Sequence, residues 1–204
     1  MINVRENFGD IDIYLFDQLQ KGRFQPGMKI LDAGCGGGRN IFWFIQNGFD
    51  VSAIDVDEDA ITNIRELASS VAPDLPSGNF QTATLAEIPF GDLSFDWVIC
   101  NAVLHFARDR AQFDEWLLEM WRTLKTGGMF FARLASSIGI LDLLIPTENG
   151  RYLMPDGTER FIVDEELLKE ATQMIGAQFL EPIKTTNVEN LRCMTTWVIK
   201  KAEC

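Results

Sequence analysis

A strand, a glycine loop, a helix and a second strand follow one another early in the chain, and this order constrains the fold most. A strand is expected at 28–32, a glycine loop at 34–38, a helix at 40–47 that ends at Gly48, and a strand at 50–55. Two strands joined by a helix lie parallel, because the crossover returns the chain to the same end of the sheet. The unit predicts an α/β fold.

The alternation continues along most of the chain. Helices are expected at 61–71, 113–124 and 165–175, with Asp164 as the last helix's N-cap, and strands at 80–84, 95–100, 129–134, 179–185 and 191–200. The last two strands are only a few residues apart, too close for a crossover helix, so they are expected to be antiparallel. We predict a Rossmann-like, doubly wound α/β fold whose seven-stranded, mostly parallel sheet ends in an antiparallel hairpin, with helices on both faces.

The chain shows no internal repeat or linker, so one domain over 1–204 is expected. Residues 1–27 are expected to form an N-terminal helix or lid. The segment 136–163 contains prolines and glycines and shows no sustained period. It is expected to cover the crevice at the carboxyl ends of the strands.

Composition excludes several kinds of partner. The 204 residues carry 18 Lys and Arg against 30 Asp and Glu, a formal charge of −12, which repels nucleic acid. No apolar run is long enough for a membrane span, and the N-terminus lacks the basic and apolar regions of a signal peptide. We expect a cytoplasmic monomer or homodimer that binds neither nucleic acid nor membrane.

The residues that bind zinc are sparse in this chain, although a metal site made of carboxylates alone stays open. The four cysteines form no CxxC pair, and His105 is the only histidine. A zinc site is therefore not predicted, and we assign no metal ligands.

The glycine loop indicates which ligand the fold binds. Its pattern, Gly34-x-Gly36-x-Gly38, follows Asp32, and Arg39 stands where a dinucleotide fingerprint has its last glycine. An acid beside the loop repels phosphate but suits a cationic ligand. Asp55, at the end of the second strand, has the position of the acid that binds ribose hydroxyls in such folds, although it could instead cap the helix that follows. A positively charged adenosine ligand is predicted.

Four segments in order resemble the class I S-adenosylmethionine-dependent methyltransferases. They are the first motif at 30–38, the acidic strand end at 54–57, the stretch 88–98 that leads into the fourth strand, and the turn 124–128. The resemblance implies S-adenosylmethionine as cofactor. It places Gly34 and Gly36 at the methionine part, Asp55 at the ribose and Val56 on the adenine.

One position departs from that family's pattern, because Thr84 stands where many members have an acid for the adenine amino group. The Leu85 N–H is still expected to donate to the adenine ring. Tyr14 on the N-terminal helix is expected as a lid, although a packed surface helix is the alternative. The full set of expected cofactor-binding residues is Tyr14, Asp32, Gly34, Cys35, Gly36, Arg39, Asp55, Val56, Thr84, Leu85 and Asn101.

Within that family, the chain is similar to the tellurite-resistance type in Gly38-Arg39-Asn40, in 103–106 and in the ending 191–201. This subgroup resemblance implies a small soft oxyanion such as tellurite or selenite as methyl acceptor. The net charge of −12 opposes its approach, so local cations must compensate. The available cations are Arg133, Arg151, Lys184 and Arg192.

The expected catalytic residues are His105, Arg133 and Arg192. His105 follows the fourth strand and is the only side chain that ordinarily titrates near neutral pH, so it is predicted to act as a base or to contact substrate. A histidine that merely bonds a loop carbonyl is the alternative. Trp43, Trp116 and Trp121 are interpreted as core residues. Two other functions remain open: an NAD(P)-dependent oxidoreductase, or a regulatory protein that binds S-adenosylmethionine without turnover.

Overall fold

A computed structural model describes residues 4–203; the chain ends, 1–3 and 204, lie outside the described residues. The main sheet has the strand order β10-β11-β5-β4-β1-β2-β3, with β9 paired to β11. Its strands are β1 (Lys29–Ala33), β2 (Asp50–Asp55), β3 (Phe80–Thr82), β4 (Phe95–Asn101), β5 (Leu124–Ala135), β9 (Ala177–Phe179), β10 (Lys184–Val188) and β11 (Arg192–Lys201). Strands β1 to β5 are parallel, whereas β11 runs antiparallel to β5, β9 and β10. The predicted fold class is confirmed.

The expected number of seven strands is wrong, because the stretch 179–185 is not one strand. It divides into β9 and β10, which pair with different parts of β11: Phe179 faces Ile199, and Lys184 faces Thr196. Pro182 lies between them and has no N–H to give to a ladder, so the pairing is interrupted there.

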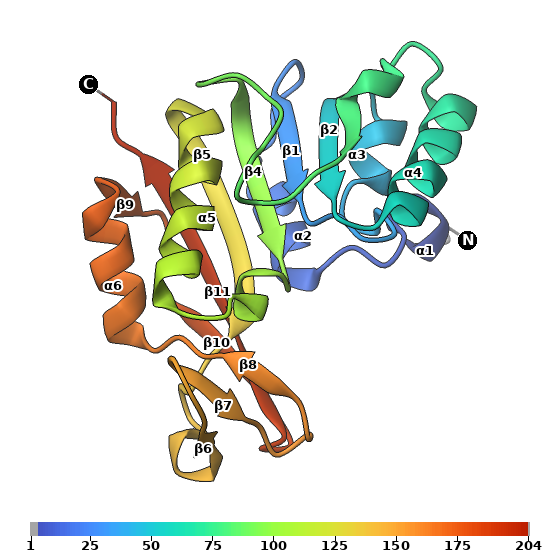
Figure 1. Ribbon diagram of the computed structural model, residues 1–204. Coiled ribbons are helices and arrows are strands. Elements are labelled where there is room, and N and C mark those ends of the chain that lie inside the picture. The colour runs from blue at the N-terminus through green and yellow to red at the C-terminus, as the bar shows by residue number, and fades with distance from the viewer. Residues whose placement is uncertain (1–3, 204) are drawn as a thin grey trace.

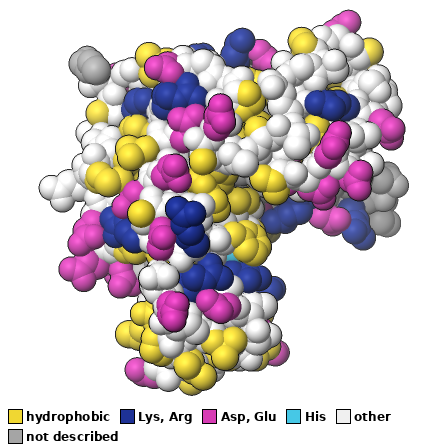
Figure 2. All heavy atoms as spheres, viewed as in Figure 1, with side chains coloured by type: hydrophobic (Ala, Val, Ile, Leu, Met, Phe, Trp, Pro, Cys, Tyr) yellow, Lys and Arg dark blue, Asp and Glu magenta, His cyan; other side chains and the backbone are white. Residues whose placement is uncertain are grey.

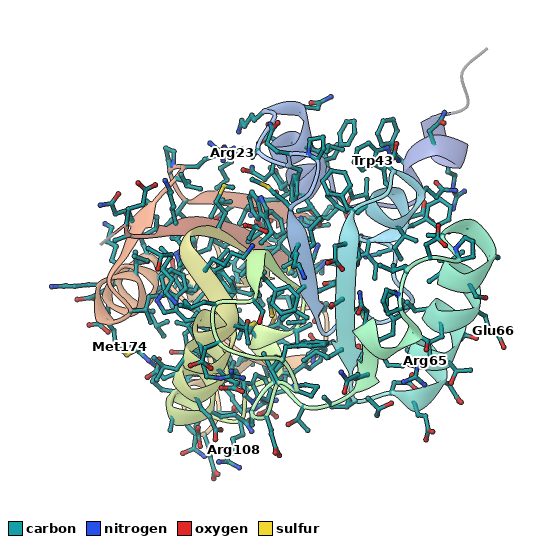
Figure 3. All side chains as sticks on the ribbon, turned by 90° about the horizontal axis from the view of Figure 1, so that it is seen from above. Arg23, Trp43, Arg65, Glu66, Arg108 and Met174 are labelled. Atoms are coloured by element: carbon teal, nitrogen blue, oxygen red, sulfur yellow. The ribbon has the colours of Figure 1, made fainter. Side chains whose placement is uncertain are left out.

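Helices cover both faces of the sheet (Figure 1; Figure 3, from above). They are α1 (Val4–Phe8), α2 (Ile13–Gln20), α3 (Phe42–Gln46), α4 (Glu58–Val71), α5 (Arg110–Thr123) and α6 (Glu165–Met174), with one-turn 3-10 helices η1 (Ser77–Asn79), η2 (Leu104–Phe106) and η3 (Leu141–Leu143). One core joins the sheet to α5 and α6, and a second joins it to α2, α3 and α4. In residues 4–203 no helix has the length and apolar character needed to cross a membrane.

The segment 136–163 contains regular structure that its sequence did not indicate. It forms a separate antiparallel sheet in the order β6 (Ile145–Pro146), β7 (Arg151–Leu153) and β8 (Glu159–Phe161). These strands are two or three residues long, too short to show alternation. In Figure 1 this small sheet projects beyond the carboxyl ends of the parallel strands. The small sheet lies at that end of the main sheet, and its role as a cover over the crevice stays a prediction.

Candidate functional site

A cavity of about 720 Å³ lies at the carboxyl ends of β1, β2 and β4. The chain crosses from β1 to β2 on one side and reaches β4 on the other, which is the topological switch point where α/β sheets bind ligands. The lining residues come from the glycine loop, the ends of β2 and β4, the loop 83–86, η2 and α5: Gly34, Cys35, Gly36, Gly37, Arg39, Asn40, Asp55, Val56, Ala83, Thr84, Leu85, Ala86, Asn101, Ala102, Val103, Phe106, Gln112 and Trp116.

Two hydrogen bonds fix the glycine loop against β2. The N–H groups of Gly34 and Cys35 both donate to the Ile54 carbonyl, at 2.9 and 3.0 Å. Gly34 has φ +83°, and a Cβ there would meet Cγ2 of Val103 at 2.5 Å, so this position requires glycine. Gly36 has φ +48°, and a Cβ there would meet no atom within 4 Å. Its open side leaves room for a ligand to approach the backbone.

Asp55 ties the glycine loop to the end of β2. Its Oδ2 accepts the Gly36 N–H at 2.7 Å, and its Oδ1 accepts the Asp57 N–H at 3.0 Å. The N-cap of α4 is Asp57, which accepts from Asp59, so the capping role considered for Asp55 belongs to Asp57. Each oxygen of a carboxylate can accept about two hydrogen bonds, so Asp55 keeps capacity for ligand hydroxyls in the cavity. Next to it, Val56 is 70% exposed and offers an apolar surface.

Asp32 is a buried carboxylate beneath the same loop. Neither of its oxygens has a hydrogen-bond partner among the described residues, and its exposure is 0%. Burial raises the pKa of Asp32 to about 7, against a lowering by the charge of Arg39. An unpaired buried carboxylate is costly unless a cation comes near, so the site fits a positively charged ligand. Burial also raises the pKa of Cys35, which keeps its thiol neutral.

Asp32→Asn tests this burial by the pH dependence of stability without ligand. Since the folded pKa of about 7 exceeds the usual 3.8, the stability that Asp32 contributes is fully present below pH 3.8 and is lost as the pH rises through 7. We expect the unfolding free energy of the variant, relative to wild type, to rise by about 4 kcal/mol between pH 4 and pH 8 in urea titrations. Titration of His105 changes the unfolding free energy of both proteins equally, so its contribution cancels in the difference. If the unfolding free energies of the two proteins instead changed in parallel with pH, the raised pKa of Asp32 would be contradicted.

Most of the expected cofactor residues lie together in this cavity: Gly34, Cys35, Gly36, Arg39, Asp55, Val56, Thr84, Leu85 and Asn101. The Leu85 N–H donates to no described residue, and the buried Asn101 amide has no partner for its nitrogen or oxygen within residues 4–203. Both groups are therefore available to a ligand. Asp32 lies beneath the lining instead of in it.

Tyr14 is not among the residues lining the cavity. Its hydroxyl shares a 2.7 Å hydrogen bond with Oγ1 of Thr186 on β10, and its ring lies under the Arg133 guanidinium. The N-terminal segment does reach the loop elsewhere: Arg39 donates to the Asp10 carbonyl, and the Asp12 N–H donates to Oδ1 of Asn40. These contacts bring residues 10–12 to the glycine loop.

Sequence reasoning missed the far wall of the cavity. It is formed by Phe106 on η2 and by Gln112 and Trp116 on α5. Trp116 was expected in the core; it is half-buried, packs against the core and also lines the cavity. A core tryptophan and a tryptophan that also lines a cavity have the same helical spacing with buried neighbours, so the sequence carried no signal that separates the two cases.

A second cavity of about 310 Å³ adjoins the first, since Arg39, Asn101 and Ala102 line both. It contains all three expected catalytic residues, His105, Arg133 and Arg192. Arg151 and Lys184 do not line it. Arg151 pairs with Glu159 at 2.9 Å, and Lys184 pairs with Asp17 and Glu181. Arg160, which the sequence did not single out, lines it instead. Figure 2 shows Lys and Arg side chains gathered near the histidine, where the lower projection that contains β6, β7 and β8 (Figure 1) meets the rest of the molecule.

The surroundings of His105 favour a hydrogen-bond donor over a base. Its Nδ1 accepts the Ala135 N–H at 3.3 Å, so the proton of the neutral ring is on Nε2. Burial, with the charge of Arg160, lowers the pKa of His105 to about 4. The ring is therefore neutral at pH 7 and a weak base. The structure pairs it with a backbone N–H, not with the loop carbonyl that the alternative interpretation named.

The fold and the cavity define an α/β protein with a ligand-sized cavity at its topological switch point. A family model described as "Methyltransferase domain" matches residues 31–132. The chain therefore belongs to the methyltransferase domain family, and its resemblance to class I S-adenosylmethionine-dependent methyltransferases is confirmed. The tellurite-resistance subgroup stays a prediction.

Individual relatives agree with this family. The chain is 33% identical over 147 residues to a ubiquinone biosynthesis O-methyltransferase of Caulobacter vibrioides, covering 69% of this chain and 56% of that protein. It is 29% identical over 112 residues to an uncharacterized methyltransferase of Synechocystis, covering 55% and 49%. The chain thus spans about half the length of the curated relatives it matches.

Solved structures share the fold at low identity. A Burkholderia thailandensis 1,6-didemethyltoxoflavin-N1-methyltransferase with bound S-adenosylhomocysteine superimposes with a TM-score of 0.71 at 18% identity, over 98% of this chain and 82% of that one. A Pyrococcus horikoshii protein gives a TM-score of 0.73 at 20% identity, over 93% and 89%. At these identities the likeness shows the fold alone.

Proposed function

We propose that this chain transfers a methyl group from S-adenosylmethionine to a small acceptor. The observation that carries the proposal is the pair of carboxylates at the glycine loop: Asp55 faces the cavity, and Asp32 lies unpaired beneath it. A ribose with two hydroxyls and a sulfonium cation matches the two groups in chemistry and in charge.

The remaining cavity residues would hold the adenosine. Val56 gives an apolar surface for the base, and the free Leu85 N–H supplies a donor to a ring nitrogen. Thr84 lines the cavity with a hydroxyl where many relatives of this class have an acid, so we expect a weaker bond to the adenine amino group. Tyr14 stays a proposed lid residue. Its contacts with Thr186 and Arg133 hold it outside the cavity lining, and they do not by themselves require the N-terminal helix to close over the site.

The bound cofactor supplies an electrophilic methyl group, and the protein's part is to align the acceptor with it. Alignment alone removes about 7–11 kcal/mol of barrier in well-oriented reactions, so an acceptor with a free lone pair needs no base. This agrees with a neutral, weakly basic His105 at the adjoining cavity. Its Nε2–H can orient an acceptor oxygen as a donor.

Soft oxyanions such as tellurite or selenite are our specific proposal for the acceptor. They carry a lone pair on the central atom, and arginines line the second cavity. An NAD(P)-dependent oxidoreductase is disfavoured by Asp32 beneath the loop and by Arg39 in place of the last glycine, because both differ from a pyrophosphate site. We keep as proposals a cytoplasmic monomer or homodimer without nucleic-acid or membrane partners.

Calorimetry and a transfer assay test the proposal in turn. Wild type should bind S-adenosylmethionine and S-adenosylhomocysteine but not a nicotinamide cofactor. Labelled methyl transfer should then be screened over selenite, tellurite, thiols, phenols and amines. Tight nicotinamide binding without S-adenosylmethionine binding would overturn the class. Cofactor binding without any methylated product would favour the regulatory alternative.

A further inference from the structure

We infer that the second cavity is an anion pocket, in which Arg160 and Arg192 bind the acceptor through an oxygen anion. The inference rests on the proposed methyltransferase function and names the chemistry that recognises the acceptor. The anion belongs either to an inorganic oxyanion or to a carboxylate on an organic acceptor.

The pocket gathers arginines from separate parts of the chain. Arg133 lies on β5, Arg160 on β8, Arg192 on β11, and Arg39 on the glycine loop. The pocket thus forms where the main sheet, the loop and the small sheet β6-β7-β8 meet. Such convergence gives several donors around one small volume, the arrangement that fits a carboxylate or oxyanion.

Two of these arginines share one counter-ion. Arg133 donates to Asp12 Oδ2 at 2.8 Å, and Arg39 lies 3.9 Å from the same oxygen. Asp12 is only 3% exposed, so this carboxylate serves as a buried counter-ion for the pair. Arg133 and Arg39 therefore shape the wall more than they attract a ligand.

Arg160 and Arg192 are not compensated in this way. Within residues 4–203 neither lies within ion-pair distance of a carboxylate; Arg160 donates to the neighbouring Glu159 carbonyl and lies over the Phe106 ring. Against the effect of burial, hydrogen bonds from Thr158 and the charges of Arg192 and Arg160 lower the pKa of Asp156, so this acid balances part of their charge from a longer distance. Asp156 is the one acid lining the pocket, and Thr158 already donates two hydrogen bonds to it, from N–H and Oγ1. The four arginines face two carboxylates, Asp12 and Asp156, which leaves a positive excess.

The other lining groups complete a site for a small anion. His105 is neutral and carries its proton on Nε2, which adds a donor without a second cation. Met154 and Met194 form apolar wall, which suits the body of an organic acceptor. Phe106 lines the cofactor cavity and stacks under Arg160 of the anion pocket, so the two sites are in contact.

This local excess resolves the problem set by the net charge of −12. Charges farther away than about 8 Å are largely screened at physiological ionic strength, so the arginines of the pocket outweigh the distant acids for a bound anion. The long-range field still slows anion entry. The affinity of the pocket for an anion is therefore set by the arginines that line it.

Calorimetry with matched probes tests the pocket. Wild type saturated with S-adenosylhomocysteine is titrated with selenite, with benzoate and with benzamide, the neutral counterpart of benzoate. We expect saturable binding of selenite or benzoate, at least tenfold tighter than benzamide, and a loss of at least tenfold in the variant R160Q/R192Q. Binding of selenite alone identifies an inorganic oxyanion as ligand type, and binding of benzoate alone identifies an organic carboxylate.

The control is R108Q, which removes one positive charge from an exposed arginine just before α5 (Figure 3) that pairs with Asp109 and lines neither cavity. It should bind anion like wild type, and all variants should bind S-adenosylhomocysteine within twofold of wild type. No anion binding to wild type, unchanged binding in R160Q/R192Q, or an equal loss in R108Q would overturn the pocket. Failure of wild type to bind S-adenosylhomocysteine overturns the proposed function instead, and the titration on unloaded protein still decides the pocket.

Discussion

Asp55→Ala should lower the affinity for S-adenosylmethionine at least about 100-fold. The variant loses the acceptor proposed for two ribose hydroxyls, and each hydrogen bond to a charged group contributes roughly 1.5–3 kcal/mol. It also frees the Gly36 and Asp57 N–H groups that Asp55 now holds, which loosens the loop where the cofactor would lie. Calorimetry with S-adenosylmethionine and S-adenosylhomocysteine measures the change.

Asp57→Ala is the matched control for this substitution. It removes a carboxylate two residues away that caps α4 and does not line the cavity. Loss of an N-cap costs about 1 kcal/mol of stability, so its melting temperature should fall while its affinity stays within a few-fold. Unchanged affinity in Asp55→Ala would remove the ribose assignment, and equal losses in both variants would assign the effect to the loop and helix start.

The cofactor side of the site was predictable because its determinants are local in sequence. Gly34 needs a positive φ and no side chain, and Asp55 ends the strand that the loop packs against. A short segment therefore carries both the pattern and the reason for it. The same holds for the parallel strands, whose apolar runs reflect burial on both faces.

The acceptor side depends on packing between distant segments, which the sequence does not display. Arg160 reaches the pocket only because β6-β7-β8 folds as a sheet of very short strands. Arg151, from the same segment, is paired with Glu159, and Lys184 is paired with Asp17 and Glu181. Which arginine keeps its charge for a ligand is decided by these pairings.

Tyr14 illustrates the same limit at the N-terminus. The apolar helix around it was recognisable, and α2 forms at Ile13–Gln20. Its partner, Thr186, lies on β10 at the far end of the chain. The position of the ring is set by that contact and by Arg133, so a helix prediction alone could not place it.

Gly34→Ala should destabilise the protein by about 2–4 kcal/mol. The added Cβ would lie 2.5 Å from Cγ2 and 3.0 Å from Cγ1 of Val103, and the residue would keep φ +83°. A β-branched side chain has few rotamers into which it can retreat, so the clash and the backbone strain both contribute. Urea unfolding measures the loss, and cofactor affinity should fall with it because the loop shifts.

Gly37→Ala and Val103→Ala separate the two contributions. Gly37 is in the same loop, has no positive φ, and would place its Cβ in open space, so its variant should stay within about 0.5 kcal/mol of wild type. In Gly34→Ala/Val103→Ala the nearest remaining Val103 contact is the 3.2 Å one to its Cβ. The double variant should therefore recover about 1–2 kcal/mol relative to the sum of the single losses. Additive losses would instead assign the whole effect to the left-handed backbone at Gly34.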